Sequence, residues 1–343
     1  MNAKLMIALL MTCVAVFAVS DSTLAQDNYE EAYKLATAGK HAEAIPLLEE
    51  HCNKYPKDPK GGNLLAQCYI KTKQVEKASE RLAVVLEHHP EDDKSQFLMG
   101  TVLQLQKKTE KALTHFELAA KAKPENGTYQ YYYGSVLLQM KKLPEAGEAL
   151  EKAVKAMPND PKANLDYGRL FVLTGDYESA ASHLQIAAKS DSTKALALPY
   201  LGIAQLQTQK YDDAIVTLTQ ATAADKTDPK LFFNLGQAYD AKIGDKPQSP
   251  DAMKNSIEAY SEAVKLDAQN ADAQYKLGRA YEKAALTIYE KAHEETATDL
   301  KAKAIDLLGK AKTAYGAAVK IDAQNPASKS IAGIDEMLAS LNQ

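Results

Sequence analysis

The chain has 343 residues, of which 45% are hydrophobic, and its 41 basic and 45 acidic side chains give a formal net charge of −4. The length and the apolar content are sufficient for a large buried core, which excludes an intrinsically disordered chain. The balanced charge excludes a dedicated nucleic-acid-binding protein, because neutralising phosphates requires a broad positive surface.

The first 25 residues are typical of a secretory signal peptide. Lys4 provides a basic start, an uncharged apolar run covers residues 5–19, and the small residues Thr23 and Ala25 precede a cleavage point. The run is shorter than the roughly 20 residues of a membrane-spanning helix. We expect residues 1–25 to be removed, so that the mature protein has no integral membrane span and is periplasmic or secreted. An uncleaved anchor or a buried first helix is the alternative.

Two cysteines remain after removal of the signal peptide, which contains Cys13. Cys52 and Cys68 form an even pair in a compartment where disulfides persist, and a bridge between them would contribute about 3 kcal/mol by restricting the unfolded chain. The alternative is a pair of buried free thiols, because cysteine is among the most buried residue types. The sequence leaves both interpretations open.

A repeat of 34 residues governs the remainder of the chain. Each unit contains two apolar stretches of helical periodicity around a short turn, which predicts an antiparallel helix hairpin. Small residues in both helices allow the two backbones to approach closely. One hairpin cannot bury both of its faces, so the hairpins must stack into a solenoid. The phased residues are Ala44, Ala78, Ala112, Ala146, Ala180 and Ala214; Gly100, Gly134, Gly168, Gly202 and Gly236; and Pro56, Pro90, Pro124 and Pro158.

These units resemble the tetratricopeptide repeat. The matching marks are Leu-Gly-x-x-Tyr in the first helix, as in residues 235–239, and Gly-Asp-Tyr-x-x-Ala across the turn, residues 175–180. The resemblance covers residues 26–324 as about eight repeats, and it implies an all-α, right-handed superhelical solenoid. The first two repeats depart from the pattern, because His51 and Val85 occupy sites that are usually small.

Two insertions interrupt the repeat. Gly236 and Gly278 lie 42 residues apart, which places extra residues near 243–250, a stretch of turn-forming residues. The added segment of the last repeat, residues 283–310, is rich in Ala, Lys, Glu and Leu and has no proline, so we expect it to lengthen both helices. We interpret this arm either as a contact element or as residues that pack only on each other.

The last segment, residues 325–343, predicts one amphipathic helix. Ile331, Ile334, Leu338 and Leu341 recur at helical spacing on one face. A stack of hairpins exposes apolar surface at its end, so we expect this helix to cap the solenoid.

The sequence contains no motif of enzyme chemistry. A Gly-rich phosphate loop, a Gly-x-Ser-x-Gly elbow and a His-Glu-x-x-His helix are all missing. The adjacent residues His88 and His89 would point to different sides of a helix, so we interpret them as a solvated helix end and not as a metal site. We therefore expect a protein that is not an enzyme and that uses no metal or other cofactor.

The resemblance to the tetratricopeptide repeat implies a concave groove lined by the first helix of each hairpin. The groove positions are mostly aromatic or apolar, and tyrosine hydroxyls and amides offer hydrogen bonds to an extended or helical peptide. The alternative is that these rings half-pack against the neighbouring repeat. The groove candidates are Tyr29, Tyr33, Phe97, Tyr131, Tyr132, Leu165, Tyr200, Phe233, Asn234 and Tyr275.

Two functions remain open. The favoured one, based on the resemblance, is a scaffold or assembly factor of the cell envelope that holds segments of one or more partner proteins in this groove. The alternative is an accessory protein for glycan binding or polysaccharide export, in which aromatic faces stack on sugar rings. Neither function involves nucleic acid.

Overall fold

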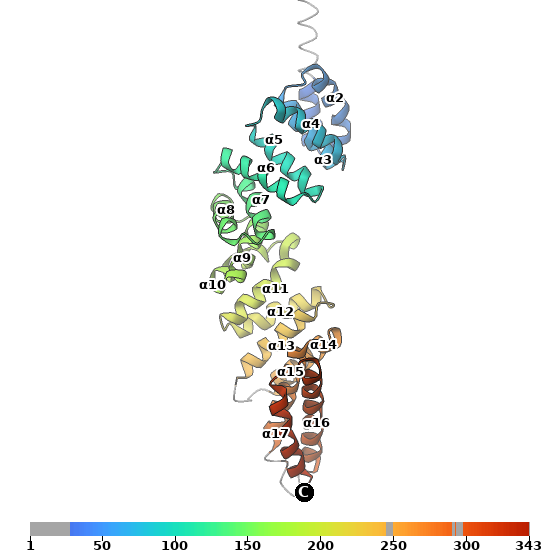
Figure 1. Ribbon diagram of the computed structural model, residues 1–343, viewed down its shortest axis with the longest axis vertical. Coiled ribbons are helices and arrows are strands. Elements are labelled where there is room, and N and C mark those ends of the chain that lie inside the picture. Colours follow the sequence, from blue (N-terminus) through green and yellow to red (C-terminus); the bar gives the residue numbers. More distant parts are fainter. Residues whose placement is uncertain (1–27, 245–249, 290–291, 293–297, 343) are drawn as a thin grey trace, which may run out of the picture. The chain divides into compact units, whose positions relative to one another are not determined.

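The computed structural model describes residues 28–244, 250–289, 292 and 298–342. All regular elements in these residues are helices, and consecutive helices pair as antiparallel hairpins (Figure 1). The predicted signal peptide and the centre of the first insertion, residues 245–249, lie outside the described residues. The fold is an all-α repeat solenoid, as the resemblance implies.

The helices follow one another with short connections. Residues 28–37 form a first helix that shares a core with α2. The later helices are α2 (His41–Lys54), α3 (Pro59–Lys71), α4 (Val75–His88), α5 (Asp93–Leu105), α6 (Thr109–Ala122), α7 (Gly127–Gln139), α8 (Leu143–Ala156), α9 (Pro161–Thr174), α10 (Tyr177–Ala187), α11 (Asp191–Gln207), α12 (Tyr211–Ala224), α13 (Pro229–Ile243), α14 (Pro250–Leu266), α15 (Ala271–Tyr289), α16 (Thr298–Ile321) and α17 (Ala327–Leu341).

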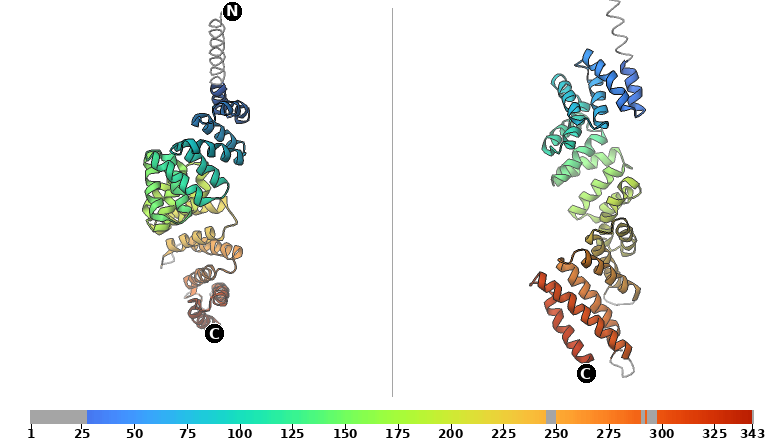
Figure 2. Two further views of the ribbon diagram at one scale, coloured as in Figure 1. Left: turned by 45° about the horizontal axis from the view of Figure 1, so that its top comes forward. Right: turned by 90° about the vertical axis from the view of Figure 1, so that its right-hand side faces the viewer.

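The helices form two compact units that divide after Pro158. Unit 1 contains the helices up to α8, and unit 2 contains α9 to α17. Within each unit every hairpin packs on the next, for example through α4 and α5 in unit 1 and through α12 and α13 in unit 2 (Figure 2). This stacking buries the faces that a single hairpin would leave exposed.

Side-chain caps fix where the first helix of a hairpin begins. Asp58 accepts hydrogen bonds from the backbone N–H groups of Lys60 and Gly61 at 3.1 and 2.8 Å. Asn126 caps α7 and Asp160 caps α9 in the same way. An aspartate or asparagine at this position satisfies donors of the first turn that have no partner within the helix, which is worth about 1 kcal/mol per helix.

The turns inside the hairpins place one residue in the left-handed conformation. Gly39 and Gly175 supply it in two hairpins, with φ of 79° and 85°. An L-residue in this conformation costs roughly 1–2 kcal/mol, because its Cβ atom crowds the carbonyl oxygen. Four other hairpins nevertheless hold a residue with a side chain there, with φ between 60° and 62°: Lys73, Lys107, Lys141 and Gln209.

The phased glycines make room for one large side chain of the second helix. A Cβ atom on Gly100 would lie 2.7 Å from the ring of Phe116, and one on Gly236 would lie 2.7 Å from the ring of Tyr260. The sequence predicts only that small residues of both helices meet. The structure shows that glycine in the first helix also accommodates a fully buried Phe, Leu or Tyr of the second helix, so that close packing is kept.

Glycines of α3 compensate the departures in the first two repeats. His51 and Val85 are both buried at sites that hold alanine in later repeats. The ring of His51 lies against Gly61, where an added Cβ atom would be 2.5 Å from Cδ2, and Val85 lies against Gly62. A large side chain at one site is therefore matched by a missing side chain at the facing site.

The second insertion lengthens both helices of the last hairpin. α15 and α16 have 19 and 24 residues, and α16 and α17 pack side by side (Figure 2). Leu308 is fully buried, and Tyr289, Leu300 and Leu307 pack against the same core. The described residues of the arm thus pack on one another and on α17, while Leu286 remains 49% exposed, so a role as a contact element stays a prediction.

α17 lies on the last hairpin with the apolar face that the sequence predicts. Ile334 and Leu341 are buried in the core shared with α16, and Ile331 and Leu338 are partly buried there. On its other side, Asp335 forms an ion pair with Lys312 at 2.5 Å. The helix therefore covers apolar surface that the last hairpin would otherwise expose.

Candidate functional site

A hollow in unit 1 brings together four of the ten predicted groove residues. It has a volume of about 480 Å³ and lies on the first helices of four successive hairpins, namely residues 28–37, α3, α5 and α7. We call it the unit 1 hollow. Its principal lining residues are Tyr29, Tyr33, His41, Gln67, Lys71, Lys94, Phe97, Thr101 and Tyr132.

Aromatic rings form the wall of the unit 1 hollow. Tyr29 and Tyr33 stack with ring centroids 6.4 Å apart and an interplanar angle of 28°. Phe97 meets Tyr132 edge-on at 5.1 Å and also packs against Phe116 at 5.8 Å. Tyr33 is 52% exposed, whereas Phe97 is half-buried. The wall therefore offers an accessible tyrosine face on a support of packed rings.

The rim of the unit 1 hollow is positively charged. Lys71, at the end of α3, and Lys94, in the first turn of α5, are both exposed, and neither forms an ion pair with a described residue. None of the described residues that line the hollow is acidic. In a chain with a net charge of −4, this local excess of positive charge attracts acidic groups.

The disulfide considered for Cys52 and Cys68 is not formed, because both residues are buried free thiols. Cys68 lines the unit 1 hollow, with Sγ 3.8 Å from Nδ1 of His41. Cys52 lines a different hollow together with Tyr69 and Arg81, so the two cysteines border different hollows. Burial raises the pKa of both thiols, to about 11 for Cys52, so neither is an activated nucleophile.

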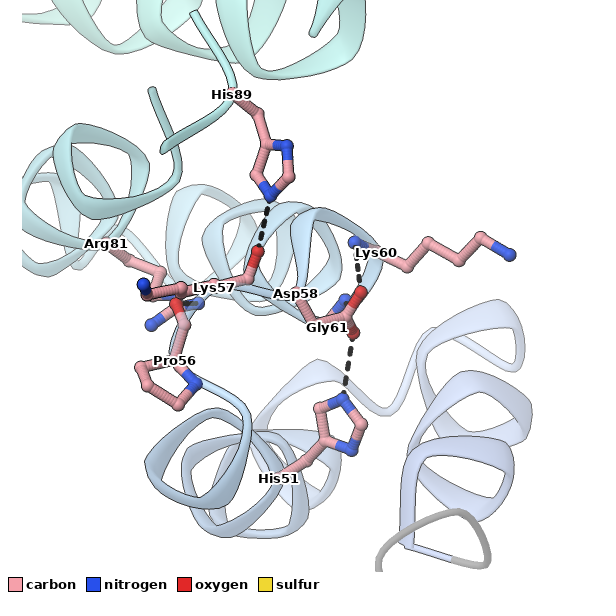
Figure 3. Close-up of polar contacts among 8 residues, drawn as sticks. All are labelled: His51, Pro56, Lys57, Asp58, Lys60, Gly61, Arg81 and His89. Carbon is pink, nitrogen blue, oxygen red and sulfur yellow. Dashed lines mark hydrogen bonds and ion pairs between the residues drawn. The ribbon is translucent and has the colours of Figure 1, made fainter. Parts of the chain in front are cut away.

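His51 contacts Asp58 (Figure 3) and packs beside Tyr29, which lines the unit 1 hollow. Its Nε2 lies 2.9 Å from Oδ2 of Asp58, and its ring lies 5.3 Å from the ring of Tyr29. Burial raises the pKa of Asp58, but hydrogen bonds from His51, Gly61 and Lys60 lower it by more than burial raises it. The pKa of this carboxyl therefore lies below its ordinary value. The Asp58 carboxylate therefore both caps α3 and fixes the His51 ring.

Two side chains of the second hairpin hold the turn that precedes α3 (Figure 3). Arg81 Nη2 donates a hydrogen bond to the carbonyl oxygen of Pro56 at 2.7 Å. His89 Nε2 lies 2.8 Å from the carbonyl oxygen of Lys57. These contacts join the first two hairpins, which both contribute to the unit 1 hollow, into one rigid support.

Three further predicted groove residues do not line the unit 1 hollow. Tyr131 meets the ring of Tyr132 edge-on at 5.1 Å. Leu165 is buried in the core of unit 2. Tyr200 lies beneath the guanidinium group of Arg169, 5.4 Å from the ring centroid. These contacts agree with the alternative that groove residues pack within the repeats.

The remaining predicted groove residues lie on α13 and α15 in unit 2. Phe233 packs against Tyr260 with ring centroids 5.8 Å apart, and Tyr275 packs against Tyr315 at 5.7 Å. Asn234 is half-buried beside Phe233 in α13. Both aromatic rings are thus supported by a tyrosine of the second helix that is itself fully buried.

Several residues that line the unit 1 hollow were not predicted from the sequence. Lys71 follows Gln67 by four residues, Thr101 follows Phe97 by four, and Lys94 precedes Phe97 by three. Residues three or four apart share one face of a helix, so extending the groove position of Phe97 by one turn in each direction would have found Lys94 and Thr101, whereas no groove candidate lies on α3 beside Lys71.

The described residues show no metal site. They contain no group of three or more His, Cys, Asp and Glu side chains that could hold a metal ion. Among the helices described, none combines the length and the apolar character that crossing a membrane requires. The unit 1 hollow, with its aromatic wall and two lysines, is the candidate site.

Family models match most of the repeat region. A model described as tetratricopeptide repeat matches residues 35–100 and 137–198, a second with the same description matches residues 97–161, and a TPR repeat model matches residues 253–284. The chain belongs to the tetratricopeptide repeat family. This family is generally one of non-enzymatic scaffolds that bind proteins, which supports a protein-interaction scaffold in general. No curated protein matches the chain.

Solved structures share the fold. PilF of Pseudomonas aeruginosa is 19% identical with a TM-score of 0.54, over 62% of this chain and 96% of that chain. The Cut9–Hcn1 hetero-tetramer of APC/C gives 16% identity and a TM-score of 0.50, over 73% of this chain and 48% of that chain. A tetratricopeptide repeat protein from Parabacteroides merdae gives 14% identity and a TM-score of 0.46, over 75% of this chain and 99% of that chain.

Proposed function

We propose that the protein is a scaffold or assembly factor of the cell envelope that holds a segment of a partner protein in the unit 1 hollow. The observation that carries the proposal is the lining: the accessible ring of Tyr33 lies in one hollow with Lys71 and Lys94. An apolar side chain of the partner would pack on the aromatic wall, and acidic groups beside it would approach the two lysines.

The compartment in this proposal rests on the N-terminal sequence. Residues 1–25 have the basic start, the short apolar run and the small residues of a secretory signal peptide. The mass of the intact protein isolated from native cells tests this part. We expect a chain that begins at Gln26, and a cytoplasmic protein that keeps residues 1–25 would contradict it.

The structure decides which substitutions test binding without damaging the fold. Tyr33 is 52% exposed, so Tyr33→Ala removes one face of the hollow at little cost in stability. Lys94→Glu reverses the charge at the rim. Phe97 is a poor choice, because its ring supports Phe116 and Tyr132. Leu173→Ala is the matched control, since Leu173 is 60% exposed and lies in unit 2.

The test uses residues 26–343 with a photo-crosslinking amino acid at Gln67, which lines the hollow. Illumination in native envelope extract is expected to attach a protein segment that contains apolar and acidic residues. The variant Tyr33→Ala/Lys94→Glu should lose at least about 90% of this product, as a loss of ~1.4 kcal/mol in binding implies, and Leu173→Ala should keep it. Equal crosslinking in both variants would contradict the proposal. Attachment of polysaccharide would support the glycan-binding alternative.

A further inference from the structure

Tyr260 in unit 2 presents a buried hydroxyl group without a partner. The residue is fully buried in α14, and its Oη has no hydrogen-bond partner among the described residues. Leaving a buried hydroxyl unpaired costs about 1–3 kcal/mol. A hydrogen-bond acceptor that reached this hydroxyl would remove that cost.

The next repeat contains the same arrangement with the acceptor in place. Tyr315 packs on Gly278 as Tyr260 packs on Gly236, and an added Cβ atom on either glycine would lie 2.6–2.7 Å from the facing ring. The hydroxyl of Tyr315 donates a hydrogen bond to the carboxylate of Glu282. A tyrosine hydroxyl at this position of the repeat is thus matched to a carboxylate.

Asp240 takes the position of Glu282 in the repeat that contains Tyr260. Each of the two acids lies four residues after the glycine on which the tyrosine packs. The side chain of Asp240 is one methylene shorter, and its Oδ1 lies 2.6 Å from Nζ of Lys283. The carboxylate of Asp240 therefore bonds to this lysine instead of to the Tyr260 hydroxyl.

Both Tyr260 and Asp240 line a hollow of about 240 Å³ on α11, α13, α14 and α15. Gln207, Gln237, Asp240, Tyr260 and Lys276 contribute to its lining. Lys276 is half-buried and forms no ion pair with a described residue. Because the Asp240 carboxylate is already neutralised by a lysine, the hollow has an excess of positive charge and of hydrogen-bond donors.

We propose that this hollow binds the carboxylate of a glutamate or aspartate side chain of a protein ligand. The carboxylate accepts a hydrogen bond from Tyr260 and pairs with Lys276, and it takes the place that Glu282 has in the following repeat. The site lies within unit 2 and does not depend on the unit 1 hollow. A failure of the proposed function in unit 1 would therefore leave this site untouched, and the reverse also holds.

The test uses N-acetylglutamate N-methylamide as the probe and its glutamine analogue as the uncharged control. Residues 26–343 carry ¹³C at Cζ of tyrosine, and the Tyr260 signal is assigned by its loss in Tyr260→Phe. We expect a saturable shift of this signal with the glutamate probe and none with the glutamine analogue. Lys276→Gln should weaken the binding about tenfold, because it removes the charged partner.

The repeat itself supplies the sharpest control. Asp240→Glu places the acid of the next repeat opposite Tyr260, so it should occupy the hydroxyl, abolish binding of the probe and raise the melting temperature. Tyr315→Phe, whose hydroxyl is already bonded within the chain, should leave binding unchanged. The proposal is overturned by the absence of a saturable shift at ~10 mM probe, by equal shifts with both probes, or by calorimetric binding that survives Tyr260→Phe.

Discussion

Both units place aromatic residues at the same position of the repeat, yet the rings have different surroundings. In unit 1, Tyr29 packs beside His51, with ring centroids 5.3 Å apart, and lines a hollow together with the exposed Tyr33. In unit 2, Phe233 lies opposite Tyr260 and packs against its ring. The ring of Phe233 thus packs on a buried tyrosine of the second helix, whereas the ring of Tyr29 borders a hollow beside an exposed ring.

The largest expected effect separates a packed ring from an available one. Phe233→Ala should lower the free energy of unfolding by about 2–4 kcal/mol, because it removes the support of Tyr260, whereas Tyr33→Ala should lower it by less than ~0.5 kcal/mol. Urea unfolding followed by circular dichroism measures both values. A loss with Tyr33→Ala as large as that with Phe233→Ala would show that the ring of Tyr33 also belongs to the core.

A second comparison concerns the helix caps of the two units. Asp58 caps α3 and also bonds to His51, whereas Asp160 accepts hydrogen bonds from the backbone of Lys162 and Ala163. Asp58→Ala should therefore destabilise the protein by about 1–2 kcal/mol at pH 7, and Asp160→Ala by about 1 kcal/mol.

The pH dependence of stability tests whether the ionised carboxylate of Asp58 causes the loss of stability in Asp58→Ala. Its pKa is lowered in the folded chain, so its contribution is complete above the unfolded-state value of about 3.9 and is lost as the pH falls through the folded-state value. The stability difference between wild type and Asp58→Ala should shrink when urea unfolding is measured at decreasing pH from 5 to 3. A difference that is constant over this range would contradict the role of the ionised carboxylate.

The turns of the hairpins give an effect of opposite sign in the two units. Lys107 in unit 1 and Gly175 in unit 2 both have positive φ, 60° and 85°. Lys107→Gly should raise the free energy of unfolding by about 1 kcal/mol, and Gly175→Lys should lower it by a similar amount. Equal and unchanged melting temperatures for both variants would mean that these turns relax without cost.

The 34-residue period was sufficient to predict the hairpins and their stacking, and the composition of residues 283–310 predicted the helical arm of the last repeat. The period could not separate available rings from packed ones, because that depends on contacts between helices that the period does not specify. Phe97 and Phe116 lie 19 residues apart in the sequence, and this separation does not indicate a contact. Their rings meet because the two helices of the hairpin are antiparallel. The pairing of His51 with Gly61 and the separation of Cys52 from Cys68 depend on the same geometry.

The smallest expected effect comes from a pair of matching histidines, one in each unit. His115 Nδ1 lies 2.6 Å from the side-chain oxygen of Gln96, and His183 Nδ1 lies 2.8 Å from that of Asn164. Burial lowers the pKa of both histidines. The unfolded chain, in which histidine has a pKa of about 6.5, therefore binds protons more readily than the folded chain. The contribution of each histidine to stability is complete at neutral pH and declines as the pH falls below that value.

His115→Gln and His183→Gln should each reduce the loss of stability between pH 7 and pH 5 by less than about 1 kcal/mol. Because the two residues lie in separate units, the reductions should add in the double variant. Urea midpoints at the two pH values measure the effect, with His88→Gln, at an exposed helix end, as the control. If the double variant kept the full pH dependence of the wild type, the two buried histidines would not be its source, and other groups that titrate between pH 7 and pH 5 would have to account for it.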